Sequence, residues 1–133
     1  MKDLIWDNAL SVDVDEIDDD HRKLVELFNR LNHALENGDA TNYVEAVLEE
    51  LISCTIWHFR HEERLMLNYG YDGFEEHKAE HQSLIETANK MRNMFLQQGR
   101  QALSDEIEPL EHWLTGHILS TDMELGSFLG KVM

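Results

Sequence analysis

The chain has 133 residues, of which 42% are hydrophobic, and it contains one proline and one cysteine, Cys54. This length is enough for one domain over residues 1–133 with a buried core, and a lone cysteine excludes an intramolecular disulfide and a cysteine-based zinc site. The formal net charge of −16 repels phosphate backbones and anionic lipids, so neither nucleic acid nor a membrane is expected as a partner.

The first part of the chain, before the acidic run Asp18–Asp20, contains Trp6 and Val12 but little periodicity. We interpret it as an extended N-terminal arm packed across the rest of the molecule. The three aspartates offer an N-cap and acidic first-turn residues for a first helix. Apolar residues then recur every three or four positions, and this helix should end near Asn37-Gly38.

Two further helices are predicted in the middle of the chain. The second begins between Asp39 and Thr41 and ends at about Asn68, where a segment with two glycines breaks the pattern. The third begins near Phe74, carries an apolar stripe with a period of 3.6 residues, and ends before Gly99.

A fourth helix is predicted in the last third of the chain, capped by Ser104 or Asp105 and continuing to about Ile118. Pro109 lies close to its start, so it either opens the regular helix or kinks the first turns. Four helices joined by short loops imply antiparallel neighbours. We therefore predict an all-α fold, an antiparallel up-down-up-down four-helix bundle with an extended N-terminal arm and a short C-terminal segment.

Two pairs of polar residues have a spacing that suits metal binding. His58 and Glu62 are four residues apart, which on a helix places them about 40° apart around the axis and about 6 Å apart along it. His77 and His81 repeat this spacing on the third helix. Each pair can therefore reach one site from one face of its helix.

His117 and Asp122 are five residues apart, about 140° around an ideal helix. They can share a face only if the helix ends or unwinds between them, and Ser120-Thr121 is a plausible place because both side chains can bond to backbone. His21 lies just inside the first helix on the side of its apolar residues. Its ring is expected to point towards the core.

Seven side chains of the kind that bind metals would thus project inward from four helices. Burying them without a metal would be very costly, because buried polar and charged groups need partners. The set is large enough for two ions, and nitrogen and oxygen donors without thiolate favour iron over a structural zinc site. The seven candidates are His21, His58, Glu62, His77, His81, His117 and Asp122.

Three other histidines, His33, His61 and His112, lie on the outer sides of their helices by position and are predicted to face solvent. Glu63 is expected to pair with a neighbouring base or amide instead of a metal. The run from His77 to His81 also matches His-x-x-Glu-His, the inverted zinc-protease signature, but a single zinc ion would leave most of the seven candidates unused. Ferritin-like di-iron proteins need Glu-x-x-His pairs, and this chain has none.

The runs His58–Glu63, His77–His81 and Trp113–Ile118, with Asp122, resemble the motifs of the hemerythrin family, most closely its bacterial single-domain members. The resemblance extends over nearly the whole chain and fills all seven ligand positions. It implies a single hemerythrin-like domain with a non-haem centre of two iron ions joined by an oxo or hydroxo bridge. Glu62 and Asp122 would bridge both irons. One iron would be completed by His77, His81 and His117. The other would be held by His21 and His58.

The resemblance also implies that dioxygen binds at an open position on the two-histidine iron. We therefore expect reversible oxygen binding for storage, transport or delivery to an oxygen-consuming enzyme system, and no dedicated enzymatic activity. A dry apolar pocket would favour such reversibility. Its candidate lining is Leu24, Phe28, Cys54, Phe59, Trp113, Leu114 and Ile118.

Two other functions stay open, namely an oxygen or redox sensor that acts on a separate partner chain, and a di-iron enzyme that handles peroxide or nitric oxide. The chain shows neither an apolar signal-peptide core nor a stretch that approaches the roughly 18 apolar residues of a membrane span. One cysteine is compatible with a reducing compartment. We expect a cytoplasmic monomer without membrane insertion.

Overall fold

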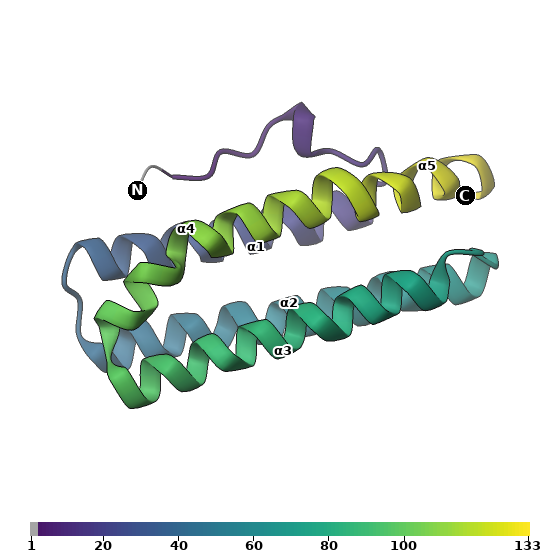
Figure 1. Cartoon of the computed structure of the whole chain (residues 1–133). Coiled ribbons are helices and arrows are strands. Elements are labelled where there is room, and N and C mark those ends of the chain that lie inside the picture. The colour runs from purple at the N-terminus through teal and green to yellow at the C-terminus, as the bar shows by residue number, and fades with distance from the viewer. Residues whose placement is uncertain (1–2) are drawn as a thin grey trace.

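The computed structural model describes residues 3–133, so the first two residues of the predicted arm lie outside it. Four long antiparallel helices form a bundle (Figure 1). Each helix packs on the next in the chain, and the fourth closes on the first. The helices are α1 (Asp15–Glu36), α2 (Thr41–Tyr69), α3 (Phe74–Gln98) and α4 (Arg100–His117). The predicted all-α up-down-up-down bundle is confirmed.

The predicted ends of the second and third helices are correct to within about one residue. Gly70 follows α2 with φ of 69°, and Gly99 follows α3 with φ of 88°. Glycine adopts these positive angles without the steric cost that a Cβ atom imposes. Gly70 therefore ends α2, and Gly99 ends α3 and turns the chain into the next helix.

Two predicted helix starts are wrong. α1 begins at Asp15 and not at Asp18–Asp20, and α4 begins at Arg100 and not at Ser104 or Asp105. Gly99 alone joins α3 to α4, so the reversal of the chain fixes the start of α4 without a side-chain cap. Pro109 lies inside α4, where its missing N–H removes one helical hydrogen bond. Figure 1 shows the first turns of α4 rising steeply from α3 before the helix runs along α1.

The N-terminal arm packs across the bundle as predicted, with one short 3-10 helix, η1 (Asn8–Leu10), within it. Its side chains Leu10, Val12 and Val14 are buried. Asp18 is also buried, and its carboxylate accepts hydrogen bonds from the Ser11 hydroxyl at 2.6 Å and the Val12 amide at 2.9 Å. Asp18 therefore anchors the arm to α1.

The predicted short C-terminal segment is helical and continues the line of α4. A π-helical turn, η2 (Ile118–Asp122), leads directly into α5 (Met123–Val132). Leu125 and Leu129 of α5 are fully buried, so this segment extends the core beyond the end of α4. Within residues 3–133, no helix combines the length and the apolar character that crossing a membrane requires.

Candidate metal centre

All seven candidate ligands are buried, and none has more than 6% of its surface exposed. They come from every long helix and from the π-helical turn. α1 supplies His21, α2 supplies His58 and Glu62, α3 supplies His77 and His81, α4 supplies His117, and η2 supplies Asp122. Their ligand atoms form two overlapping groups, and within each group these atoms lie within 4.8 Å of one another.

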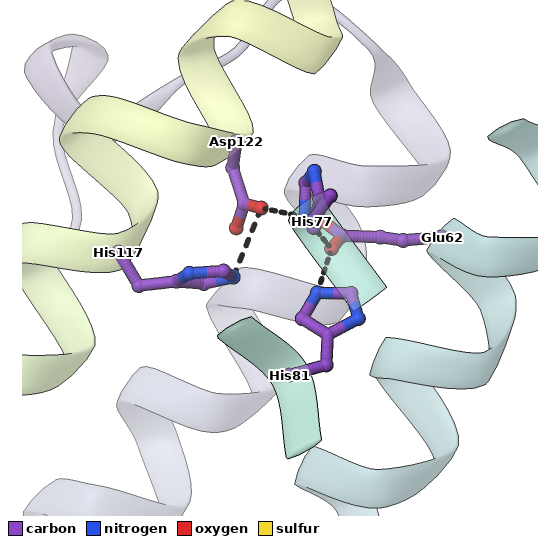
Figure 2. Close-up of side chains that lie close together, drawn as sticks. All are labelled: Glu62, His77, His81, His117 and Asp122. Atoms are coloured by element: carbon purple, nitrogen blue, oxygen red, sulfur yellow. Dashed lines mark hydrogen bonds and ion pairs between the residues drawn. The ribbon is translucent and has the colours of Figure 1, made fainter. Parts of the chain in front are cut away.

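The larger group contains three histidines and the smaller group contains two. Both groups include the same two carboxylates. The three-histidine group, drawn in Figure 2, consists of Glu62, His77, His81, His117 and Asp122, and the two-histidine group of His21, His58, Glu62 and Asp122. The structure thus brings together all the residues that were predicted as ligands.

Glu62 directs one carboxylate oxygen to each group. Its Oε1 lies 3.1 Å from Nε2 of His77 and 2.9 Å from Nε2 of His81, both in the three-histidine group. Its Oε2 lies 3.2 Å from Nε2 of His58, in the two-histidine group. A carboxylate placed in this way is suited to bridge two cations.

Asp122 divides its oxygens in the same way. Its Oδ1 lies 3.1 Å from Nε2 of both His77 and His117, whereas its Oδ2 lies 2.9 Å from Nε2 of His21. Both carboxylates therefore link the same two groups of histidines.

The π-helical turn explains how His117 and Asp122 reach one site. A π-helical turn accommodates a five-residue spacing on one side of the helix, which an α-helix does not. The predicted departure from α-helix is therefore confirmed, in the form of a widened turn. The Ser120 hydroxyl bonds to the carbonyl of Gly116 at 2.7 Å, as was expected of this residue.

A layer of carboxylates lies behind the histidines. An ionised carboxylate can only accept hydrogen bonds. Each histidine ring paired with one therefore donates from Nδ1 and turns Nε2 towards the centre. The three pairs are His58 with Asp20 at 2.9 Å, His81 with Glu63 at 2.9 Å, and His117 with Glu80 at 2.6 Å. The predicted pairing of Glu63 with a neighbouring base is confirmed.

Sequence reasoning missed Asp20 and Glu80. Both lie beside predicted ligands in the chain, Asp20 next to His21 and Glu80 next to His81, but each bonds to a histidine of another helix. Glu80 is the glutamate of the His-x-x-Glu-His run. It orients His117, which differs from the role of a catalytic base beside a zinc ion.

The three excluded histidines differ in environment. The side chains of His33 and His112 are 53% and 73% exposed, which confirms the prediction for both. The prediction for His61 is wrong, because its side chain is only 14% exposed and its Nδ1 bonds to Asp20 at 2.6 Å. His61 belongs to neither ligand group.

The predicted lining is correct for five residues, which border the cavity beside the ligands, namely Leu24, Phe59, Trp113, Leu114 and Ile118. Phe28 lines an adjoining apolar cavity instead. Cys54 borders neither cavity and is half-buried. Thr55, one residue further along α2, takes its place, and Leu84 of α3 completes the wall.

The centre is strongly polarised. Burial of the His58 ring opposes its positive charge, but the carboxylates of Glu62 and Asp20 outweigh this and raise its pKa to about 10. Burial also lowers the pKa of His77, but the carboxylates of Asp122 and Glu62 outweigh it and raise this pKa to about 9. Burial alone would raise the pKa of Glu62, yet the surrounding imidazoles, His58 foremost, hold it well below its ordinary value.

Several polar atoms at the centre have no hydrogen-bond partner within the described residues. They include Oε2 of Glu62, Nε2 of His117 and both carboxylate oxygens of Asp122. Buried polar atoms without hydrogen-bond partners are costly, and cations between the imidazole and carboxylate groups would satisfy them. The nitrogen and oxygen donors therefore fit a centre of two metal ions, and the five imidazoles favour transition metals.

Comparison with known proteins gives a consistent result. The model of the hemerythrin HHE cation binding domain matches residues 12–129. A bacteriohemerythrin from Pseudomonas aeruginosa is 33% identical over 123 residues, covering 92% of this chain and 78% of that protein. One from Methylococcus capsulatus is 29% identical over 112 residues, covering 84% and 85%. A crystal structure of wild-type hemerythrin superimposes with a TM-score of 0.85 at 27% identity, covering 93% of this chain and 95% of the other.

Proposed function

The chain belongs to the hemerythrin family, and on that premise we propose that it binds dioxygen reversibly at a non-haem di-iron centre. One observation carries the proposal. Glu62 and Asp122 each direct one oxygen to a group of three histidines and the other to a group of two. This unequal arrangement leaves one ion with fewer protein ligands than the other, and an open coordination position distinguishes a reactive metal site from a closed structural one.

In this proposal Glu62 and Asp122 would each help to hold both irons. The histidines would follow the two groups. His77, His81 and His117 would hold one iron, and His21 and His58 would hold the other. The iron pair supplies the electrons and the open position that dioxygen binding requires. The protein supplies the geometry, the exclusion of water and the orientation of each imidazole.

The cavity beside His21 and His58 suits a small apolar guest. Its volume is about 10 Å³, close to the space that one water-sized molecule needs by the same measure. A second apolar cavity of about 20 Å³ shares three wall residues with it, Thr55, Trp113 and Leu114. A diatomic gas thus has two adjoining spaces between the helices, and the smaller one borders His21, His58 and His117.

The walls of the cavity also favour reversible binding. Apart from the ligands, they are apolar side chains with two polar exceptions, Thr55 and the indole N–H of Trp113. The Thr55 hydroxyl donates to the carbonyl of Leu51 at 2.7 Å, so its proton is engaged within α2. Exclusion of water and of mobile protons hinders irreversible reduction of the guest, which can then leave as dioxygen.

The test is an absorption spectrum of the iron-loaded, reduced protein. In air it should gain a charge-transfer band, and the band should disappear on deoxygenation and return over repeated cycles. Absence of a reversible band contradicts the proposal. Sustained turnover of peroxide or nitric oxide above the rate of autoxidation would instead favour an enzyme.

A further inference from the structure

His61 is not a metal ligand, yet it is held close to one. Its Nδ1 donates to Oδ2 of Asp20 at 2.6 Å, and the same oxygen accepts from Nδ1 of His58 at 2.9 Å. The side chains of His61 and Asp20 are only 14% and 11% exposed. One carboxylate of α1 thus joins two histidines that lie one turn apart on α2.

The surroundings of His61 fix its ring in this position. Nε2, on the far side of the ring, lies 3.6 Å from the carboxylate of Glu16, one turn before Asp20 on α1. The ring of Trp57 lies against it, with the ring centres 5.5 Å apart. His61 therefore lies between two acidic residues of α1 and an aromatic side chain of its own helix, and its short hydrogen bond to Asp20 orients the ring.

The two ligand groups differ in how many of their rings an outer carboxylate orients. In the three-histidine group, Nδ1 of His77 has no partner among the described residues, whereas His81 and His117 each donate Nδ1–H to a carboxylate. In the two-histidine group only His58 does so, because Nδ1 of His21 has no partner among the described residues. The orientation of the smaller group therefore depends on one carboxylate, Asp20, and on what holds that carboxylate in place.

We propose that His61 is a positioning residue for the two-histidine half of the centre: by fixing Asp20 against His58, it keeps the second metal ion bound. The inference rests on the metal centre in the proposed function, but not on dioxygen binding. Loss of an outer hydrogen-bond partner of a metal ligand typically weakens metal binding by 10- to 100-fold. His61 contacts the outer partner Asp20 and not the ligand itself. Its loss should therefore weaken the binding of one of the two ions by about tenfold and leave the binding of the other unchanged.

The test measures ferrous iron content and its release to a chelator under anaerobic conditions. His61→Phe retains a ring against Trp57 but lacks the donor, whereas His61→Asn places an amide donor near the position of Nδ1. We expect two irons in the unmodified protein, one iron released about tenfold more readily in His61→Phe, and near-normal release in His61→Asn. His33→Leu, which removes an exposed histidine paired with Asp3, is the matched control and should change nothing.

A double-mutant cycle with Asp20→Asn tests the route of the effect. If His61 acts through Asp20, His61→Phe should add little in the Asp20→Asn background. Circular dichroism of each metal-free variant separates loss of folding from loss of metal, and His61→Asn provides a second comparison that retains the donor. Equal retention of both irons in His61→Phe, or a full additional effect in the Asp20→Asn background, overturns the inference. An unmodified protein that binds no pair of iron ions contradicts the metal centre itself, which is a different result.

Discussion

At the scale of single residues, Glu62 and Asp122 are the side chains that turn two sets of histidines into one centre. Each carboxylate is buried and reaches imidazoles of both groups with different oxygens. Histidines alone would give two separate sites with little negative charge to balance the cations. The bridging oxygens therefore determine whether two ions bind together.

The first prediction concerns Glu62→Gln, which retains the shape of the side chain but removes the anionic bridge. Iron content should fall from two ions per chain to one or none, and the oxygen-dependent absorption band should be lost. Metal analysis and the air and deoxygenation spectra check this result. His112→Gln changes a histidine that is 73% exposed and should match the unmodified protein. Full iron content in Glu62→Gln would show that the ligand assignment is wrong.

The second prediction concerns the stability of the metal-free protein as a function of pH. The folded-state pKa values of His58 and His77 are raised to about 10 and about 9. A raised histidine pKa stabilises the fold fully below the unfolded value of about 6.5, and the contribution is lost as pH rises through the folded value. The metal-free protein should therefore unfold at lower urea concentration at pH 10 than at pH 7.

Lysine and tyrosine side chains also titrate near pH 10, so a variant is needed to isolate the centre. In metal-free His58→Gln, the decrease between pH 7 and pH 10 should be smaller than in the unmodified protein. An equal decrease in both proteins would mean that His58 does not contribute. Bound metal replaces the imidazole protons, so the metal-loaded protein should show little of this pH dependence.

At the scale of single elements, the π-helical turn η2 brings Asp122 to the centre. Two hydrogen bonds secure it to α3, because Glu80 accepts from Nδ1 of His117 at 2.6 Å and from the hydroxyl of Thr121 at 2.7 Å. The two donors lie near the two ends of the turn. A single glutamate thus holds the widened segment in the conformation that brings Asp122 to the centre.

The third prediction is that Thr121→Val destabilises the metal-free protein by about 1 kcal/mol. A hydrogen bond to a charged group contributes about 1.5 to 3 kcal/mol when buried, and the 38% exposure of the Glu80 side chain reduces this. Urea denaturation measures the change. Thr87→Val is the control, since the Thr87 hydroxyl is exposed and bonds only to the carbonyl of Ser83 in its own helix. Equal effects of the two substitutions would contradict the role of Thr121.

At the scale of the whole molecule, the N-terminal arm and α5 pack against each other. Gly126 of α5 allows this close approach, because a Cβ atom there would overlap the carbonyl oxygen of Val12 and come within 2.8 Å of the Val12 Cβ. The arm is anchored next to this point by Asp18. Two segments from opposite ends of the chain thus depend on one residue without a side chain.

The fourth prediction compares two alanine substitutions in α5. Gly126→Ala should destabilise the protein by about 1 to 3 kcal/mol, the usual cost of overpacking, because the arm must move. A Cβ at Gly130 meets nothing within 4 Å, so Gly130→Ala should stabilise the helix by up to about 1 kcal/mol. Thermal unfolding of both variants checks the difference in sign. A destabilising Gly130→Ala or a neutral Gly126→Ala would contradict this account of the packing.

The local patterns of the chain were enough to predict the bundle and the residues that its centre brings together. Spacings such as that of His58 and Glu62 specify one face of a helix, because helical geometry is local and repeats every 3.6 residues. The same local rule required a change of helix between His117 and Asp122. These predictions needed no knowledge of how one helix is rotated against another.

Packing between helices sets the layer behind the ligands and the starts of α1 and α4, which local patterns did not predict. Asp20, Glu80 and His61 bond across helices, and such contacts depend on the relative rotation and height of elements that are far apart in the chain. The start of α4 follows from the chain reversal at Gly99, a tertiary constraint that its local capping pattern does not contain. Local periodicity determines which face of a helix is apolar, whereas packing determines what that face contacts, and packing placed His61 against Asp20.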